Sequence, residues 1–325
     1  MIVLRPLLVA VLLSGLAFLL LGPVPPLLAR ARWPRNAPRA ALALWHGILH
    51  TAGLSVVGVC VALAIAPLAA TYRHGLHVLL AQTLAGHPFR GLGSAQIAAL
   101  GWALAVLGWL VALLVRTAVR HMRMHRSHRD KVDLLDKRGA GDQDIPAYVS
   151  DGVRIIDHPS PVAYCLPGLR TRVVISSGLI ELLTQPELAA VVDHERAHAR
   201  GRHHLLLLPF TAGHRAVPRL PATRIAQRTT RQLAEMLADD QARRRHGGTA
   251  VAAALVRMAT HQAASPEVGP PRDGALAAAE HAVLTRVQRL LEPAAVAPWW
   301  QRSLAYTAAI VLLGTPVTLL IPCLT

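Results

Sequence analysis

Cysteine is scarce in this chain of 325 residues, which has only Cys60, Cys165 and Cys323. None of them belongs to a Cys-x-x-Cys pair, and their spacing fits neither a zinc knuckle nor a disulfide framework. Cysteine is therefore expected neither to form a metal site nor to stabilise the fold through disulfides. We expect each of the three to be a small buried hydrophobic residue.

Acidic residues are also scarce: 18 Asp and Glu stand against 34 Lys and Arg, for a formal net charge of +16. Such a charge fits nucleic-acid binding, but membrane proteins reach it too, because they place Lys and Arg on the cytoplasmic flanks of their spans. Hydrophobic residues make up 53% of the chain, above the roughly 45–50% of soluble domains. They gather in a few long runs, which is typical of membrane spans. We therefore expect contact with membrane lipid and no direct nucleic-acid binding.

Four of these runs are long enough for transmembrane helices, since a span needs about 20 apolar residues. They are Ile2–Gly22, a stretch within Ala43–Ala70, about Ala95–Val115 and about Ser303–Pro322. The first run ends before a proline-rich stretch that is not expected to continue a helix; a cleaved signal peptide is the alternative interpretation of that run. The sequence predicts a mainly α membrane protein, with three transmembrane helices in 1–118, an α+β domain in 119–300 and a fourth transmembrane helix in 301–325.

The basic residues predict an orientation. The loop 29–40 has four arginines, the loop 71–94 has two, and the segment 116–131 has six Lys and Arg. Lys and Arg are enriched in cytoplasmic loops, so 29–40 and the domain 119–300 are expected inside, and 71–94 and both termini outside. This describes a multi-pass protein of the cell membrane with a cytoplasmic domain.

Within the domain, short β-favouring runs lie between turn residues. They predict strands at Gly152–Asp157, Val162–Cys165 and Arg172–Ser176, which we expect to form a small antiparallel sheet. A short helix is expected at Ser177–Leu183. A longer helix follows Thr184, with Pro186 at its first position. Another helical run is expected to begin near Thr230, after Pro218 and Pro221 break the chain.

The longer helix carries a pattern of metal ligands. His194 and His198 are four residues apart, so both imidazoles project from one face and can hold one zinc ion. Glu195 can reach a water molecule at that ion, as a general base must. On the next helix Glu235 supplies a third ligand, and Asp239, one turn on, can hydrogen-bond a ligating imidazole. The alternative is a surface with two histidines and an acidic face, which the scarcity of acidic residues disfavours.

His-Glu-x-x-His followed on a second helix by Glu-x-x-x-Asp resembles the gluzincin membrane metalloproteases. These include the HtpX/CAAX-prenyl protease group and the bla/mec antirepressor family of the BlaR and MecR type. The resemblance covers about residues 145–292, with similar segments at Pro161–Gly168, Arg172–Ile180 and Glu187–Glu195. It implies a zincin-like cytoplasmic domain, a Zn²⁺ cofactor and a protein or peptide substrate. In the bla/mec type, such a domain lies between a third and a fourth span.

Two features depart from these families. HtpX-type enzymes usually have Asn-Ala-Phe where this chain has Val162, Ala163 and Tyr164. Bla/mec sensors have an extracellular penicillin-binding domain after the last span, whereas this sequence stops at Thr325, so β-lactam sensing by that route is not expected.

Three functions remain open, and no pattern indicates an oligomeric state. The three-plus-one layout, with three spans before the domain and one after it, slightly favours regulatory cleavage of a cytoplasmic protein such as a transcriptional repressor. An HtpX-like quality-control protease of membrane proteins is the first alternative. A catalytically silent membrane signalling scaffold is the second, and the complete set of ligands argues against it.

The implied reaction is metal-assisted peptide hydrolysis, in which Glu195 takes the proton of the attacking water and passes it to the leaving amine. The strand Arg172–Ser176 is a candidate edge for binding an extended substrate. A donor for the oxyanion is also needed. The candidates are His203, His204, His214 and His246. The sequence does not choose among them, although His203 and His204 fit better as residues that flank the helix end after Gly201.

Overall fold

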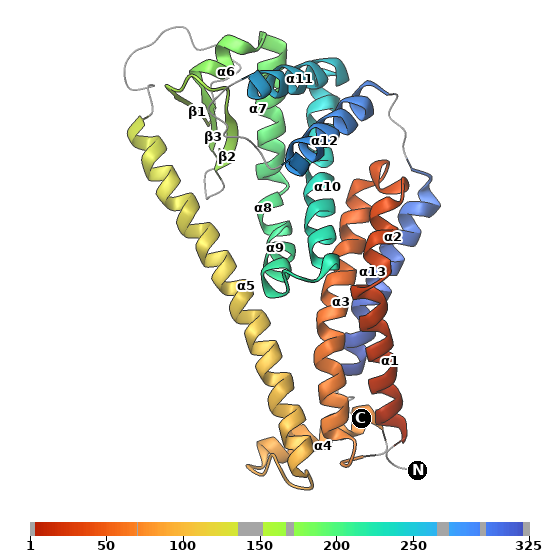
Figure 1. Ribbon diagram of the computed structural model, residues 1–325. Coiled ribbons are helices and arrows are strands. Elements are labelled where there is room, and N and C mark those ends of the chain that lie inside the picture. The colour runs from red at the N-terminus through yellow and green to blue at the C-terminus, as the bar shows by residue number, and fades with distance from the viewer. Residues whose placement is uncertain are drawn as a thin grey trace. The chain divides into compact units, whose positions relative to one another are not determined.

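A computed structural model describes residues 4–69, 71–135, 152–166, 172–264, 273–292 and 297–320. Most of these residues are helical, and the described strands form one small sheet (Figure 1). Packing divides the chain into two compact units. The membrane unit comprises Met1–Thr117, Pro209–Thr230 and Ala297–Thr325, and the domain unit comprises Ala118–Leu208 and Arg231–Val296.

Long apolar helices make up most of the membrane unit. They are α1 (Leu4–Leu21), α3 (Pro38–Ile65), the first part of α5 (Ser94–Leu135) and α13 (Trp299–Leu320). Among the described residues, three stretches are long and apolar enough to cross a membrane, namely Pro6–Arg30, Pro38–Ile65 and Ser94–Met124. These stretches overlap the first three predicted spans. The structure therefore supports a membrane-associated protein.

The helix α1 ends at Leu21, before the proline-rich stretch, as the sequence predicts, but that stretch was not expected to be helical itself. A new helix, α2 (Val24–Arg30), begins only two residues after α1, with Pro25 and Pro26 in its first turn. Proline is tolerated there because the first turn leaves its backbone N–H groups unbonded in any case.

The helix α3 packs along both α1 and α13 (Figure 1). A Cβ on Gly58 of α3 would lie 2.9 Å from Leu13 of α1. Four residues further along α3, Ala62 clusters with Ala10, so the contact moves backwards along α1 as it moves forwards along α3. The two helices are therefore antiparallel. Two shorter elements, η1 (Trp33–Arg35) and α4 (Tyr72–Leu84), flank the ends of α3 in sequence.

The contacts between α3 and α13 advance in the same direction along both helices. Gly47 lies against the backbone of Ala309, where a Cβ would be 3.1 Å from the Ala309 Cα. One turn on, the hydroxyl of the fully buried Thr51 donates a hydrogen bond to the carbonyl oxygen of Leu312 at 2.6 Å. These two helices are therefore parallel.

The sheet of the domain unit has the strand order β1-β3-β2. Its strands are β1 (Val153–Ile156), β2 (Ala163–Leu166) and β3 (Arg172–Ser176). Because β1 pairs parallel to β3 and β2 antiparallel, the prediction of an antiparallel sheet was wrong for β1. The prediction of β3 as an edge strand was also wrong, since β3 is paired on both sides. Its run of buried Val173, Val174 and Ile175 suits a central strand.

Five helices complete the core around the sheet. They are α6 (Ser177–Leu182), α7 (Gln185–Arg200), α10 (Pro221–His246), α11 (Gly248–Ala264) and α12 (Asp273–Leu291). Leu188 and Val192 of α7 pack against the sheet. On another face of α7, Ala190 packs with Ala242 of α10 and Leu290 of α12. The helix α7 is therefore held between the sheet and the later helices, which fixes the direction of its side chains.

Two predicted helix starts differ slightly from the structure. The helix α7 begins at Gln185, so Pro186 is its second residue, and the backbone N–H of Thr184 donates to Glu187 Oε2 at 2.8 Å in a capping box. The helix α10 begins at Pro221 rather than near Thr230. Pro221 therefore starts this helix instead of breaking the chain before it, because the first position of a helix tolerates proline.

Candidate metal centre

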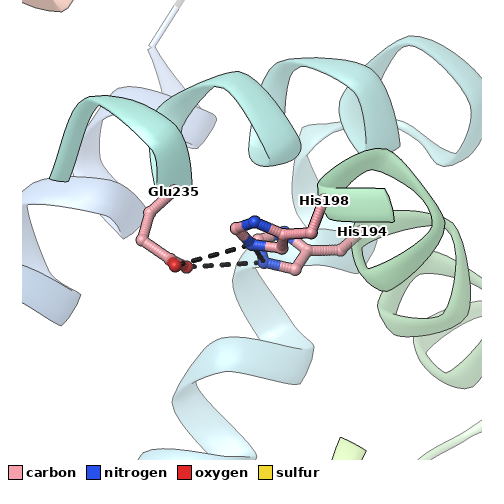
Figure 2. A group of neighbouring side chains, drawn as sticks. All are labelled: His194, His198 and Glu235. Carbon is pink, nitrogen blue, oxygen red and sulfur yellow. Dashed lines mark hydrogen bonds and ion pairs between the residues drawn. The ribbon is translucent and has the colours of Figure 1, made fainter. Parts of the chain in front are cut away.

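Three side chains from two helices of the domain unit converge on one point. His194 and His198 project from the same face of α7, and Glu235 points toward them from α10 (Figure 2). The two Nε2 atoms are 3.1 Å apart. Each lies 3.5 Å from an oxygen of Glu235, His194 from Oε2 and His198 from Oε1. The structure thus brings together the three residues predicted as zinc ligands.

The spacing of these donor atoms fits a zinc ion. Ligand atoms about 2.0–2.2 Å from a tetrahedral zinc ion lie roughly 3.3–3.6 Å from one another, close to the observed 3.1 and 3.5 Å. One ligand atom from each of the three residues lies within 4.8 Å of the other two. Two imidazoles and a carboxylate are also a donor set that zinc uses in catalytic sites.

The hydrogen bond between His194 and Asp239 also indicates a metal site. Its Nδ1 lies 3.0 Å from Oδ1 of Asp239. A carboxylate only accepts, so Nδ1 carries the proton and, in the neutral ring, Nε2 carries a lone pair. The lone pair of Nε2 and the carboxylate of Glu235 then face each other, and a cation between them satisfies both. Asp239 thus lies where the sequence predicted, behind a ligand.

Arg286 of α12 is a residue of the site that the sequence did not single out. Its Nε and Nη2 donate to the two oxygens of Asp239, both at 2.7 Å, and its Nη1 lies 3.2 Å from Oε2 of Glu235. The side chain of Asp239 is 1% exposed and that of Arg286 is 16% exposed. A buried carboxylate predicts a cationic partner, but the sequence offers 34 Lys and Arg as candidates.

The charges of the site favour a cation at its centre. Burial would raise the pKa of Glu235, but hydrogen bonds with His194 and His198 and the charge of Arg286 hold that pKa well below its usual value. Burial would lower the pKa of His194, but hydrogen bonds and charges from Asp239 and Glu235 raise it to about 9. Positive charge is therefore stabilised where the donor atoms converge, which suits a divalent metal ion.

Glu195 is half-buried next to these ligands. Burial raises the pKa of its carboxyl, while the charges of His194 and His198 and a backbone hydrogen bond from Cys165 oppose this rise. A carboxylate with a raised pKa is a better proton acceptor near neutral pH. Glu195 therefore has the environment that a general base needs, at the position that the sequence predicted for it.

The hydrogen bond from Cys165 places the strand β2 at the site. Within the part of the chain that the structure describes, β2 pairs with β3 and with no second strand. The N–H of Ser176 donates to the carbonyl of Val162, so the backbone groups of Val162 and Tyr164 face β3. Those of Ala163 and Cys165 therefore face the opposite edge. This edge of β2, and not β3, is the one that meets Glu195.

The candidate oxyanion donors have other contacts. Nδ1 of the buried His203 lies 2.8 Å from Nδ1 of His198. Nε2 of His246 lies 2.8 Å from Oδ2 of Asp193. His214, in the membrane unit, has its Nδ1 3.3 Å from the hydroxyl of Thr223. None of these contacts supports an oxyanion role.

Solvent reaches the cluster from the side of the carboxylate. The side chain of Glu235 is 38% exposed, whereas those of His194 and His198 are 12% and 16% exposed. Catalytic zinc sites keep a coordination position open for water or substrate. The more exposed side of the cluster, next to Glu235, is where such a position is accessible.

Comparison with known proteins relates part of the chain to a peptidase family. No curated protein and no solved structure matches the chain. Residues 133–264 match the family model of Peptidase family M48. The matched stretch contains His194, Glu195, His198, Glu235 and Asp239, but not Arg286. Together with the geometry of the centre, this match supports a metallopeptidase of the M48 type, whose members are typically zinc-dependent.

Proposed function

We propose that this protein is a membrane-embedded, zinc-dependent endopeptidase, whose metal is held by His194, His198 and Glu235. The observation that carries the proposal is the convergence of these three donors at 3.1–3.5 Å beside the half-buried Glu195. Neither metal ligation nor acid–base chemistry is needed for a membrane scaffold. The M48 match gives independent support for peptide hydrolysis.

The residues of the centre have distinct roles in this proposal. Zinc supplies Lewis-acid chemistry, which polarises a carbonyl oxygen and makes water more acidic. Glu195 accepts the proton of the attacking water and donates it to the leaving amine. Asp239 accepts the hydrogen bond from Nδ1 of His194 and so keeps its Nε2 available. Arg286 holds Asp239 and Glu235 in place and balances their charge.

The substrate is expected to be an extended segment of a protein. The edge of β2 offers backbone groups of Ala163 and the carbonyl of Cys165 next to Glu195, and an added strand would pair with them. Because backbone groups are the same in all peptides, this mode of binding selects an extended conformation rather than one sequence. We propose regulatory cleavage of a cytoplasmic protein, such as a transcriptional repressor, because the three-plus-one layout resembles the bla/mec type.

The proposal includes a fourth span and a cytoplasmic catalytic domain. The helix α13 has 22 residues and packs along α3, a candidate span. Its parallel direction is the one that the predicted topology requires, since both α3 and α13 would then run from inside to outside. Arginines lie at the start of both helices, in the segment 29–40 that leads into α3 and at Arg302 in the first turn of α13, as the enrichment of Lys and Arg on the cytoplasmic side predicts.

A Glu195→Gln variant tests the proposed chemistry. Purified full-length protein in detergent should hydrolyse an unfolded protein such as casein, and the variant should lose about 10²–10⁴-fold of that rate because it lacks the base. The zinc content by elemental analysis should stay the same. A Glu181→Gln variant, at an exposed position of α6, is the matched control.

The result can contradict the proposal in two ways. A wild-type protein that takes up no zinc, or a Glu195→Gln variant that hydrolyses casein as fast as wild type, would overturn it. Proteins trapped on Glu195→Gln in cells identify the substrate class. A soluble regulator supports regulatory cleavage, whereas a broad set of membrane proteins would replace it with quality control.

A further inference from the structure

His203 is a buried histidine beside the proposed metal ligands, with no role so far. It begins the short helix α8 (His203–Leu206), directly after the end of α7, and is 6% exposed. Its Nδ1 lies 2.8 Å from Nδ1 of His198, and the two rings meet edge to face with centroids 4.8 Å apart. This contact reaches His198 from behind, because Nε2 of His198 is the atom that faces His194 and Glu235.

The contact between the two Nδ1 atoms requires one donor and one acceptor. If His198 binds a metal through Nε2, its neutral ring carries the proton on Nδ1. Nδ1 of His203 must then accept this proton in the hydrogen bond, and His203 carries its own proton on Nε2. His203 would thus do for His198 what Asp239 does for His194, with a neutral acceptor in place of a carboxylate.

Two other roles for His203 do not fit its position. It is not placed as a fourth ligand, since its near nitrogen faces Nδ1 of His198 and not the point where the Nε2 atoms converge. It is not placed as an oxyanion donor either, because its remaining nitrogen lies against the end of α7. A Cβ built on Gly201 would be only 2.5 Å from Nε2 of His203.

The chain between α7 and α8 is shaped around the ring of His203. Gly201 has a φ of −73°, which any residue can adopt, so its backbone does not need glycine. The two atoms nearest to its absent Cβ both belong to His203, Nε2 at 2.5 Å and Cδ2 at 2.7 Å. Gly201 therefore leaves room for the ring of His203, which a side chain at this position would contact too closely.

Arg202 completes this turn. It has a φ of 47° and is the one non-glycine residue with positive φ among those that the structure describes. Such a left-handed conformation is strained for a residue with a side chain and is found where the surrounding structure requires it. In this chain it ends α7 and brings His203 back beneath the last turn of that helix, next to His198.

We infer that His203 is a positioning residue of the metal centre, whose Nδ1 accepts the hydrogen bond of His198 and fixes the tautomer and orientation of that ligand. This inference deepens the proposed function and rests on it, since it takes His198 as a metal ligand. Residues that hold ligating histidines contribute about 10–100-fold to metal affinity. His203 lies within the stretch that matches the M48 model.

The test compares two substitutions of His203 by zinc affinity. His203→Leu removes the acceptor and leaves the Nδ1–H of His198 without one, so the affinity of full-length protein for zinc, measured by competition with a chelator, should fall about 10–100-fold. His203→Asn places a carbonyl oxygen where Nδ1 stood, and its affinity should stay within a few-fold of wild type. His281→Leu, at an exposed histidine of α12, is the matched control.

Gly201→Ala tests the same contact from the other side. The backbone accepts alanine, but the added methyl group displaces the ring of His203, so zinc affinity should fall while the helical circular dichroism is unchanged. Substituting Co²⁺ for zinc adds a spectroscopic check, since His203→Leu should alter the visible absorption of the bound cobalt and His203→Asn should restore it.

Each outcome separates this inference from the proposed function. A wild-type protein that binds zinc, together with a His203→Leu variant that binds it equally well, would overturn the role of His203 and leave the proposed function intact. Equal loss of affinity in His203→Leu and His203→Asn would also overturn it, because packing and not the acceptor would then be responsible. A wild-type protein without zinc affinity would overturn both.

Discussion

At the scale of single residues, the centre brings three carboxylates together, those of Glu195, Glu235 and Asp239. Arg286 contacts two of them directly, and its charge also acts on Glu195. A divalent ion together with Arg286 would balance these three negative charges. Burial would lower the pKa of Arg286, but Asp239 and Glu235 raise it, so this guanidinium stays charged.

Arg286→Gln should therefore destabilise both the fold and the metal centre. Breaking a buried ion pair costs about 3–5 kcal/mol because the remaining charge has no partner, and zinc affinity should fall about 10–100-fold as Asp239 loses its anchor. Chemical denaturation and zinc competition measure the two effects. Arg289→Gln is the control, since Arg289 lies on the same helix and donates to Asp240 at 2.8 Å. Unchanged zinc affinity in Arg286→Gln would contradict this prediction.

Cys165 offers a pH-dependent prediction in the same part of the domain. Burial, together with the charges of Glu195 and Glu235, raises the pKa of its thiol from 9.0 to about 12. The thiolate is the reactive form, and a pKa difference of three units reduces its fraction about 1,000-fold at pH 8.5. Alkylation of Cys165 in metal-free folded protein should be slower by at least that factor than in denatured protein, as followed by mass spectrometry.

The sign of this effect can be checked across pH. Because the raised pKa favours the neutral thiol in the fold, the protection of Cys165 should be complete below pH 9 and should decline as the pH approaches 12. Cys60 in the same sample is an internal reference for the reagent. Equal alkylation rates of Cys165 in folded and denatured protein at pH 8.5 would contradict the prediction.

The sequence predicts those residues of the centre that share a helix with another residue of the centre. His194, Glu195 and His198 share one helix, and Glu235 and Asp239 share another, so a period of 3.6 residues is enough to place each group on a face. That the two faces meet depends on how α7 packs against α10. Arg286 and His203 could not be assigned in the same way, because one is 47 residues beyond Asp239 and the other depends on a strained turn.

At the scale of elements, local sequence patterns predict where the elements lie in the chain but not how they are arranged in space. The positions of the three strands and of α6 and α7 follow from turn residues, caps and hydrophobic periodicity. The order of the strands does not, because nothing in the local sequence says that β3 comes between β1 and β2. The helix α4 lies in a stretch that was expected to be a loop, and the buried Tyr72 at its start packs against α1 and α3.

The contact between α3 and α13 leads to a prediction at this scale. Gly47 approaches the backbone of Ala309 so closely that a side chain would force the helices apart, with its Cβ 3.1 Å from Cα and 3.2 Å from the carbonyl oxygen. Gly47→Val should therefore lower the stability of the protein in detergent by about 1–3 kcal/mol, the usual cost of overpacking. The midpoint of thermal unfolding measures this.

Gly53→Val is the matched control for Gly47→Val. It lies on the same helix, costs the same change in helix propensity, and a Cβ there meets nothing within 4 Å. Equal midpoints for the two variants would show that the close approach of α3 and α13 does not contribute to stability, and the support that this packing gives to a fourth span would be lost.

At the scale of the whole molecule, helix directions and charge give the same topology by independent routes. The helix α1 is antiparallel to α3, and α13 is parallel to α3, so α13 as the proposed fourth span would enter the membrane from the same side as α3. The basic residues, counted without reference to packing, predict that this side is the cytoplasmic one. Packing by itself does not distinguish inside from outside, and charge by itself does not show that α13 is a span.

This topology can be tested with reporters fused after chosen residues. Alkaline phosphatase, which is active only outside the cytoplasm, should be active when fused after His87 and inactive when fused after Asn36 or Ala264. A fluorescent protein that folds only inside should give the reverse pattern. Replacing Arg30, Arg32, Arg35 and Arg39 by glutamine should weaken this asymmetry, because it removes the strongest signal that retains the first loop inside. Active phosphatase after Ala264 would place the catalytic domain outside the cell. A cytoplasmic repressor could then not be its substrate, although the chemistry proposed for the metal centre would be unaffected.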